Sequence, residues 1–172
     1  VGWLGLHLSE DHGGSGFGLP ELVVVVEEMG RAIAPGPFVP PVAASAVLAA
    51  AAPADLAKRL LPGLADGSTT GAVALGGDVK VSGGKATGSA GVVIGGGLAD
   101  ILLVPAGDDV AVIDLREGNA TVDVPQNLDT TRRSARARTA SGDPPVRSPV
   151  RRTVISAARA SPMRDSREVS AP

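Results

Sequence analysis

The chain has 172 residues, of which 44% are hydrophobic, so it is long enough for one domain or two small ones with a core. It has no cysteine and only three aromatic residues, which excludes disulfides, a thiol nucleophile and cysteine-bound metals and disfavours base-stacking nucleic-acid binding. The net charge of −2 conceals an asymmetry, because residues 1–130 sum to −9 whereas residues 131–172, with ten arginines, sum to +7.

The first part of the chain predicts a loop followed by a helix. Four glycines crowd the end of residues 1–18, which is typical of a loop. A helix then begins near Pro20, a residue favoured in the first helical turn, and the turn Pro35–Pro37 lies beyond its end. Its predicted apolar face consists of Leu22, Val26, Met29 and Ile33.

Two more helices are expected before the pattern changes. The first covers Val42–Ala51 and is rich in alanine. The second covers Asp55–Leu64, and Pro62 is expected to disturb its C-terminal half.

After Gly67 the hydrophobic period changes from about 3.6 residues to 2, which indicates strands. The predicted strands are Ala72–Leu75, Val79–Val81, Val92–Ile94, Ile101–Val104, Val110–Leu115 and Thr121–Val124.

Helices followed by strands indicate an α+β fold. From Asp129 the composition changes, since residues 129–172 contain no Leu, Phe or Lys. No strand or helical period is sustained there, so we expect a disordered C-terminal tail.

The most apolar stretch, Val39–Ala54, contains three prolines and is too short to span a membrane. We therefore expect a soluble, cytoplasmic protein.

Few residues stand out as catalytic or metal-binding candidates. His7 and His12 lie five residues apart in the loop, which is not a recognised metal-ligand spacing, so we interpret them as loop histidines and expect no metal site. Glu27 and Glu28 are adjacent and point in different directions on a helix; one is expected in solvent and one in a salt bridge. Gly95–Gly97 follows a predicted strand and forms either a plain turn or a close approach for a ligand.

Several motifs in the first 138 residues resemble the acyl-CoA dehydrogenase family. The helix Glu21–Arg31, with its sequence VEEMGR, is similar to the family's helix after the N-terminal loop. The segment LPGLADG resembles the family's link into its middle β-domain, and LADILLV resembles a strand of that domain. The segments that carry the resemblance are Gly2–Gly16, Glu21–Arg31, Leu60–Gly67, Leu98–Val104 and Leu128–Ser134.

The resemblance implies a fold and an activity. The expected organisation is a partial N-terminal helical domain over residues 1–67, a partial middle β-barrel over residues 68–138 and a disordered tail over residues 139–172. The family oxidises the CH–CH group of an acyl-CoA with FAD, and the substrate is either a fatty acid or a steroid side chain. Implied partners are an electron-transfer flavoprotein and related dehydrogenase subunits in a homo- or hetero-oligomer; neither nucleic acid nor a membrane is expected.

The sequence departs from the family pattern at the flavin site. Leu75-Gly76-Gly77-Asp78 stands where the family has TEPxxGSD, so a threonine hydroxyl is missing. Val92-Val93-Ile94-Gly95 stands where the family has WITN, so a stacking tryptophan is missing. By resemblance, FAD contacts are expected from the residues Val73, Leu75, Gly76, Val92 and Ile94.

The sequence offers no catalytic residue, because the family's C-terminal helical bundle, which supplies the glutamate base, has no counterpart here. The Arg/Ser/Pro/Ala-rich tail has the composition of an out-of-frame reading of GC-rich DNA, and we expect a frameshift near Thr139. The chain alone is therefore expected to be inactive. The alternative is a non-catalytic partner subunit of a heteromeric acyl-CoA dehydrogenase. A third reading, a basic nucleic-acid-binding arm, is disfavoured because the ten arginines lack interleaved aromatics.

Overall fold

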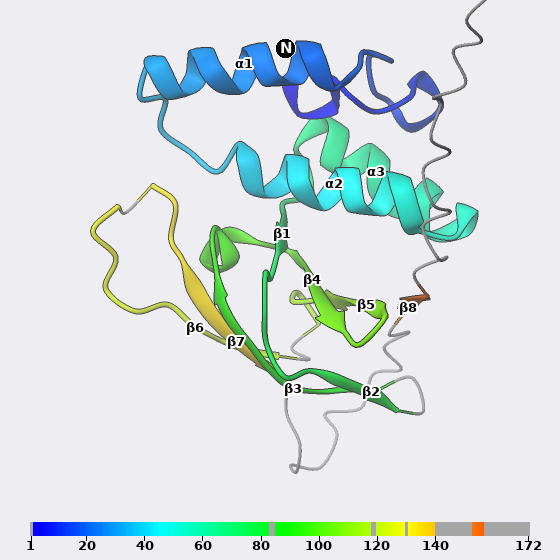
Figure 1. The fold of residues 1–172 in the computed structure, drawn as a ribbon, viewed down its shortest axis with the longest axis vertical. Helices are drawn as coiled ribbons and strands as arrows, with labels where there is room; N and C mark the ends of the chain where they lie inside the picture. Colours follow the sequence, from blue (N-terminus) through cyan, green and yellow to red (C-terminus); the bar gives the residue numbers. More distant parts are fainter. Residues whose placement is uncertain (1, 83–84, 118–119, 130, 140–152, 157–172) are drawn as a thin grey trace, which may run out of the picture.

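The computed structural model describes residues 2–82, 85–117, 120–129, 131–139 and 153–156. Three helices form one layer, and the strands that follow them lie beneath it (Figure 1). The helices are α1 (Leu19–Arg31), α2 (Val39–Ala51) and α3 (Ala54–Asp66), with short 3-10 turns at Trp3–Gly5, Glu10–His12 and Gly96–Leu98. The strands are β1 (Gly71–Val73), β2 (Lys80–Ser82), β3 (Lys85–Val93), β4 (Ile101–Ala106), β5 (Asp109–Asp114), β6 (Ala120–Asp123), β7 (Ala135–Thr139) and β8 (Thr153–Ser156). This order confirms the predicted α+β fold.

The first helix begins as predicted but ends before the last residue assigned to its apolar face. The Glu21 carboxylate accepts a hydrogen bond of 2.9 Å from the Gly18 backbone N–H, and Pro20 occupies the first turn. Leu22 is buried, whereas Ile33 lies beyond the helix at φ +49° and is 84% exposed. The prediction that Ile33 belongs to the apolar face of this helix is wrong, because the helix has already ended at Arg31.

The other two helices are longer than predicted. α2 begins at Val39, because Pro40 lies in the first turn, where its missing N–H costs no helical hydrogen bond. α3 continues past Pro62 to Asp66, so the expectation of a disturbed C-terminal half is wrong. Its buried residues Leu61 and Leu64 lie on either side of the proline, and their burial outweighs one lost backbone hydrogen bond.

The strands form two four-stranded sheets. One has the order β1-β4-β5-β8, in which only β1 and β4 are parallel, and the other has the order β2-β3-β7-β6 and is antiparallel. β3 is longer than the predicted strand Val92–Ile94 and changes register between Ser89 and Val92, beside Gly91 at φ +61°. Its first residues, KATGSAG, lack the apolar alternation that signals a strand.

Two strands lie beyond Asp129, where no strand was predicted. In β7, Ala135 and Ala137 are buried while Arg136 and Arg138 are exposed, so the strand has the expected two-residue period with alanine as its inward residue. The expectation that no strand follows Asp129 is therefore wrong for β7. β8 pairs antiparallel with β5 and lies within the segment expected to be disordered. The rest of that segment, residues 140–152 and 157–172, lies outside the described residues.

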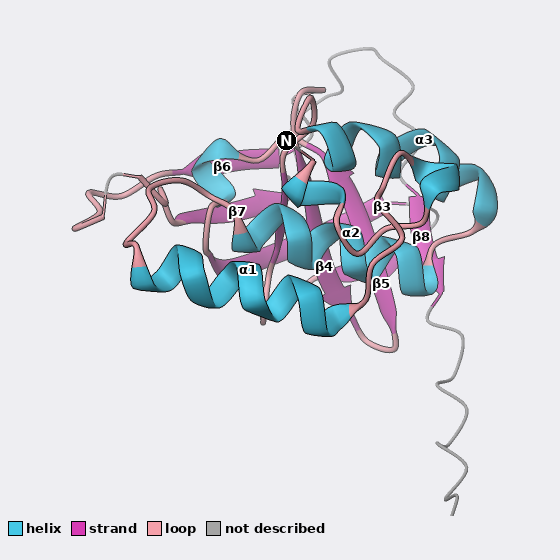
Figure 2. Ribbon diagram, turned by 90° about the horizontal axis from the view of Figure 1, so that it is seen from above, coloured by secondary structure: helices cyan, strands magenta, loops and turns pink. Residues whose placement is uncertain are grey.

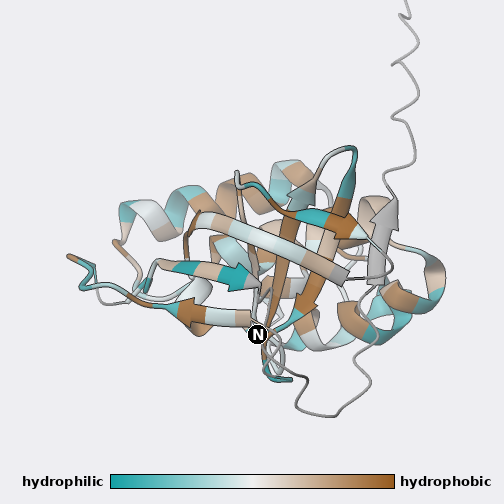
Figure 3. Cartoon of the chain, turned by 90° about the horizontal axis from the view of Figure 1, so that it is seen from below, coloured by the Kyte–Doolittle hydropathy of each residue, from teal (hydrophilic) through white to brown (hydrophobic). Residues whose placement is uncertain are grey.

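The core has two parts, one on each face of β4. Ile101 and Leu103 pack with the buried residues of α2 and α3, whereas Leu102 and Val104 pack with the second sheet. Figures 2 and 3 show the resulting layers: helices on one side, the second sheet on the other, and hydrophobic strands between them. Burial on both faces explains the continuous apolar run of β4.

Candidate functional site

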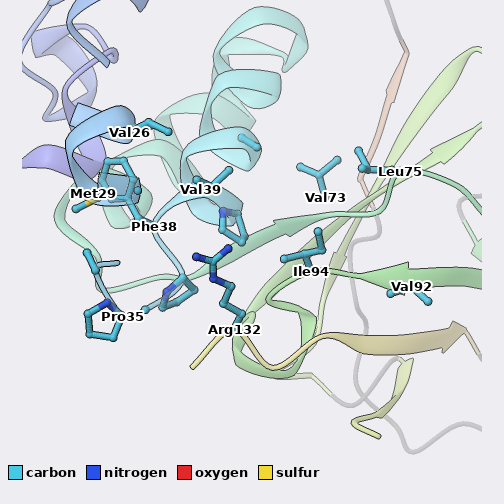
Figure 4. A pocket seen from close by; sticks show the side chains of 16 residues that line it. Val26, Met29, Pro35, Phe38, Val39, Val73, Leu75, Val92, Ile94 and Arg132 are labelled. Atoms are coloured by element: carbon cyan, nitrogen blue, oxygen red, sulfur yellow. The ribbon is translucent and has the colours of Figure 1, made fainter. Parts of the chain in front are cut away.

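A cavity of about 590 Å³ lies between the helices and the strands (Figure 4). Its helical wall comes from the C-terminal half of α1, the Pro35–Pro37 turn and the start of α2. Its β wall comes from the end of β1 and the end of β3. The lining residues are Val26, Met29, Gly30, Ala34, Pro35, Gly36, Pro37, Phe38, Val39, Pro40, Ala43, Val73, Leu75, Val92, Ile94 and Arg132.

Two tight turns bring these walls together. Gly36 adopts φ +113° in the turn that reverses the chain between α1 and α2. Gly95 adopts φ +74° after β3, and a Cβ placed on it would lie 2.9 Å from the Pro40 Cγ. Glycine is thus needed for the end of β3 to lie against the start of α2.

The glycine-rich turn after β3 is packed against the chain itself. A Cβ on Gly97 would meet the Val124 side chain and the Arg133 carbonyl oxygen at 2.9 and 3.0 Å. The Gly97 N–H donates to that same carbonyl over 2.9 Å. The space beside Gly95 and Gly97 is therefore filled, which favours a structural turn over a close approach for a ligand.

Four of the five residues expected from the resemblance to contact FAD line this cavity. These are Val73, Leu75, Val92 and Ile94, whereas Gly76 follows Leu75 but is not part of the lining. Leu75 is 86% exposed, Val92 60% and Ile94 53%, so the β wall presents uncovered apolar surface. Among the described residues, the backbone N–H groups of Leu75, Gly76 and Ile94 have no backbone hydrogen-bond partner.

The cavity contains a charged residue that sequence reasoning did not identify. Arg132 is the only ionisable residue among the described lining residues, and its Nε lies 3.1 Å from the Asp129 Oδ2. Hydrogen bonds from the Thr131 hydroxyl and backbone N–H lower the pKa of Asp129, so its carboxylate stays ionised. The signal was hidden in the sequence because Arg132 lies in an arginine-rich segment without any period.

The helical wall was also missed as part of a site. Val26 and Met29 were predicted on the apolar face of the helix, and the structure places both in the cavity lining, with Val26 36% exposed. Phe38 and Val39 belong to the start of α2, ahead of the predicted helix. Only the tertiary arrangement of α1, α2 and the strands around the cavity shows that these residues form a shared surface.

His7 takes part in local packing, and His12 ends the 3-10 turn Glu10–His12. The His7 Nε2 lies 3.1 Å from the Ser45 Oγ, and that hydroxyl, which is fully buried, donates to the Val42 carbonyl oxygen over 3.0 Å. Burial lowers the pKa of His7. In the described part of the chain, no group of three or more His, Asp or Glu side chains is arranged to hold a metal ion. His7 thus fastens the N-terminal loop to α2.

The paired glutamates both contact one arginine. Arg31 forms an ion pair with Glu27 at 2.9 Å and with Glu28 at 3.4 Å, and all three side chains are mostly exposed. The predicted salt bridge of α1 is confirmed, but the second glutamate is also close to Arg31 rather than being free in solvent. Both carboxylates lie outside the cavity lining.

Residues 1–68 match the family model "Acyl-CoA dehydrogenase, N-terminal domain". Acyl-CoA dehydrogenase FadE34 of Mycobacterium tuberculosis is 33% identical over 116 residues, which are 66% of this chain and 15% of that protein. Acyl-CoA dehydrogenase FadE12 of the same organism is 42% identical over 77 residues, which are 44% of this chain and 20% of that protein.

Solved structures agree with these relatives. A variant of the Tcur3481-Tcur3483 steroid ACAD has a TM-score of 0.70 at 29% identity. The match covers 81% of this chain and 43% of that one. The ChsE4-ChsE5 complex from Mycobacterium tuberculosis has a TM-score of 0.73 at 23% identity, covering 90% of this chain and 45% of that one, and supports the fold.

Over its N-terminal and middle parts, this chain belongs to the acyl-CoA dehydrogenase family. It spans less than half the length of these relatives and solved chains. No helix among the described residues is long and apolar enough to cross a membrane.

Proposed function

We propose that this acyl-CoA dehydrogenase family member supplies the N-terminal and middle portions of an FAD-dependent oxidoreductase acting on the CH–CH group of an acyl-CoA. The observation that carries the proposal is the cavity itself, because four residues expected to contact FAD line it together with the apolar helical wall. The helical portion corresponds to residues 1–67 and the β portion to residues 68–138. A fatty-acyl group and a steroid side chain are both compatible with an apolar lining of this size.

The β wall fits a flat aromatic ring with polar edges. Val92 and Ile94 offer exposed apolar contact surface. The backbone N–H groups of Leu75 and Gly76, which have no backbone hydrogen-bond partner among the described residues, adjoin this surface. The residues that would hold FAD are Val73, Leu75, Gly76, Val92 and Ile94. Bound FAD would supply the oxidising chemistry, acceptance of a hydride from a saturated carbon. The residues of this chain would position the ring and exclude water from it.

The helical wall would contact the acyl group. Val26, Met29, Phe38 and Val39 face the β wall across the cavity (Figure 4). Hydride transfer requires the reacting carbon and the cofactor to be in contact, and a cavity bounded by both walls would hold them side by side. An electron-transfer flavoprotein is the proposed partner of this portion of the enzyme.

The described lining offers no carboxylate to act as a base. Removal of a proton next to the thioester carbonyl needs a base within hydrogen-bond reach, and the one ionisable residue in the lining is a cation, Arg132. We therefore propose that this chain by itself does not turn over acyl-CoA. An assay with the full chain, FAD, octanoyl-CoA and an artificial electron acceptor tests this proposal. Turnover above a protein-free blank would contradict it.

FAD binding is tested separately from turnover. Equilibrium dialysis of FAD against the full chain is expected to show saturable binding, which Ile94→Asp abolishes because it places a charge in the apolar β wall. Leu128→Asp is the matched control, because Leu128 is fully exposed and outside the lining. The proposed cofactor site fails if the folded wild-type chain does not bind FAD, or if Ile94→Asp binds it unchanged.

A second candidate function is that of a non-catalytic partner subunit. The name of one similar structure, the Tcur3481-Tcur3483 steroid ACAD, pairs two gene products, and this supports a heteromeric assembly. In this case the chain would co-purify with an intact acyl-CoA dehydrogenase and carry that partner's flavin spectrum. Recovery of the chain without a flavin-bearing dehydrogenase would count against this function.

A further inference from the structure

The polar chemistry of the cavity is concentrated in one side chain. Apart from Arg132, the described lining residues are apolar, proline or glycine, and none of those side chains donates a hydrogen bond. Figure 4 shows the Arg132 guanidinium directed into the cavity between Phe38 and Ile94. A cavity of this kind favours a ligand that is apolar over most of its length and negatively charged at one point.

Arg132 uses only one of its three guanidinium nitrogens in an ion pair among the described residues. Its Nε contacts the Asp129 Oδ2 at 3.1 Å, and the other carboxylate oxygen, Oδ1, accepts hydrogen bonds from the Thr131 N–H at 2.9 Å and hydroxyl at 2.6 Å. Asp129 is thus itself fixed by its neighbour. Among the described residues, no hydrogen-bond partner is found for the two terminal nitrogens of Arg132. These nitrogens present two parallel donors, which match the two oxygens of a carboxylate.

We propose that Arg132 binds a carboxylate carried by the acyl group, so that the cavity favours an acyl chain with its own negative charge over a neutral one. The identification of the ligand as an acyl group rests on the proposed function, whereas the binding itself needs neither FAD nor turnover. A diphosphate is disfavoured, because it carries more charge than a single guanidinium offsets and the other lining side chains offer it no donors.

Calorimetric titration of the full chain with decanoate and with 1-decanol measures this preference directly. Decanoate is expected to bind about tenfold more tightly than decanol, the effect of a hydrogen-bonded charge pair at a partly exposed site. Arg132→Met and Arg132→Gln are expected to lower the affinity for decanoate to that for decanol, while the affinity for decanol stays unchanged. Arg133→Met is the matched control, because it removes the same charge from the adjacent residue, which is exposed and outside the lining.

A cavity-filling variant shows where the probes bind. Ala43 lies in the lining on α2, and Ala43→Phe is expected to abolish binding of both probes while circular dichroism shows the fold intact. Unchanged binding to folded Ala43→Phe would overturn the proposal, as would an unchanged decanoate preference in both folded Arg132 variants. A wild-type chain that binds neither probe would also overturn it.

Inorganic pyrophosphate provides the last arm of the experiment. If it binds more tightly than decanoate, displaces it and depends on Arg132, the site takes a phosphate and the carboxylate proposal is wrong. Weak pyrophosphate binding that is insensitive to Arg132→Met supports the proposal. Failure of FAD binding in the dialysis experiment would leave these titrations fully interpretable, so the two proposals fail separately.

Discussion

Helices α1 and α3 have equal lengths but different surroundings. Each has 13 residues, yet α3 buries Leu56, Ala57, Leu61, Leu64 and Ala65, whereas α1 buries only Leu22. α3 contributes these residues to the core that Ile101 and Leu103 of β4 complete, whereas α1 contributes none to it. In Figure 1, α1 lies on the far side of α2 from the strands. An apolar helix face therefore favours burial, but the face is buried only where another surface of the protein packs against it.

The unburied face of α1 has a functional consequence. Leu19, Val23 and Val24 are 60–66% exposed, and the same helix supplies Val26 and Met29 to the cavity. Because α1 contributes no residue to that core, its apolar residues Val26 and Met29 remain available to line the cavity. α3, in contrast, serves to hold the first sheet.

The largest expected effect comes from removing a core side chain of α3. Leu61→Ala should destabilise the chain by about 2–5 kcal/mol, because Leu61 is completely buried and its removal leaves a cavity. Leu19→Ala makes the same chemical change at a residue of α1 that is 66% exposed, and about 0.5 kcal/mol or less is expected. Urea unfolding followed by circular dichroism measures both. Equal losses would show that the two helices are packed alike.

A smaller loss of stability is expected at acidic pH, because His7 in the loop before α1 becomes protonated. Burial holds the pKa of His7 below its usual value of about 6.5, so the unfolded chain binds a proton more readily than the folded one. The stability that neutral His7 contributes is therefore present above that value and is lost as the pH falls below it. With the Ser45 Oγ donating to Val42, the His7 Nε2 is the donor to that hydroxyl. Protonation would make the buried Nδ1 a donor as well, and no acceptor for it is found among the described residues.

His7→Gln tests this contribution, because glutamine keeps a hydrogen-bond donor for Ser45 but does not titrate. Urea unfolding from pH 7.5 to pH 5 should show a steeper loss of stability in the wild type than in the variant. Parallel pH profiles would assign the loss to other groups.

The smallest effect is expected on the exposed side of α1. Arg31→Met removes both ion pairs of Arg31, whose side chain is 69% exposed, and should cost at most about 0.5 kcal/mol. The cost should shrink further in 1 M salt, because exposed charges are screened. Unfolding in low and high salt measures it. A salt-insensitive loss above about 1 kcal/mol would indicate that α1 depends on Arg31 for packing.

Elements with a local residue pattern could be predicted from the amino-acid sequence. Pro20 and the helical spacing of Leu22 and Met29 predicted the first helix, and the apolar run Ile101–Val104 predicted β4, as the structure confirms. The same reasoning failed at β7, where alanines are the buried residues, and at the glycine- and alanine-rich start of β3. Alanine and glycine differ little from polar residues in hydrophobicity, so strands rich in them show no clear alternation in the sequence. Such strands are recognised only from their pairing with a neighbouring strand.

The composition of the cavity, in contrast, became visible only in the folded chain. Family resemblance pointed to Val73, Leu75, Val92 and Ile94, but not to the helical wall or to Arg132. Periodicity arises from backbone geometry over a few residues, and it identifies the face of an element without specifying what covers that face. The sequence therefore does not show whether Val26 is a core residue or a cavity-lining residue. Nor does it show which of the ten arginines near the C-terminus lies in the apolar cavity. Both depend on segments that meet only after folding.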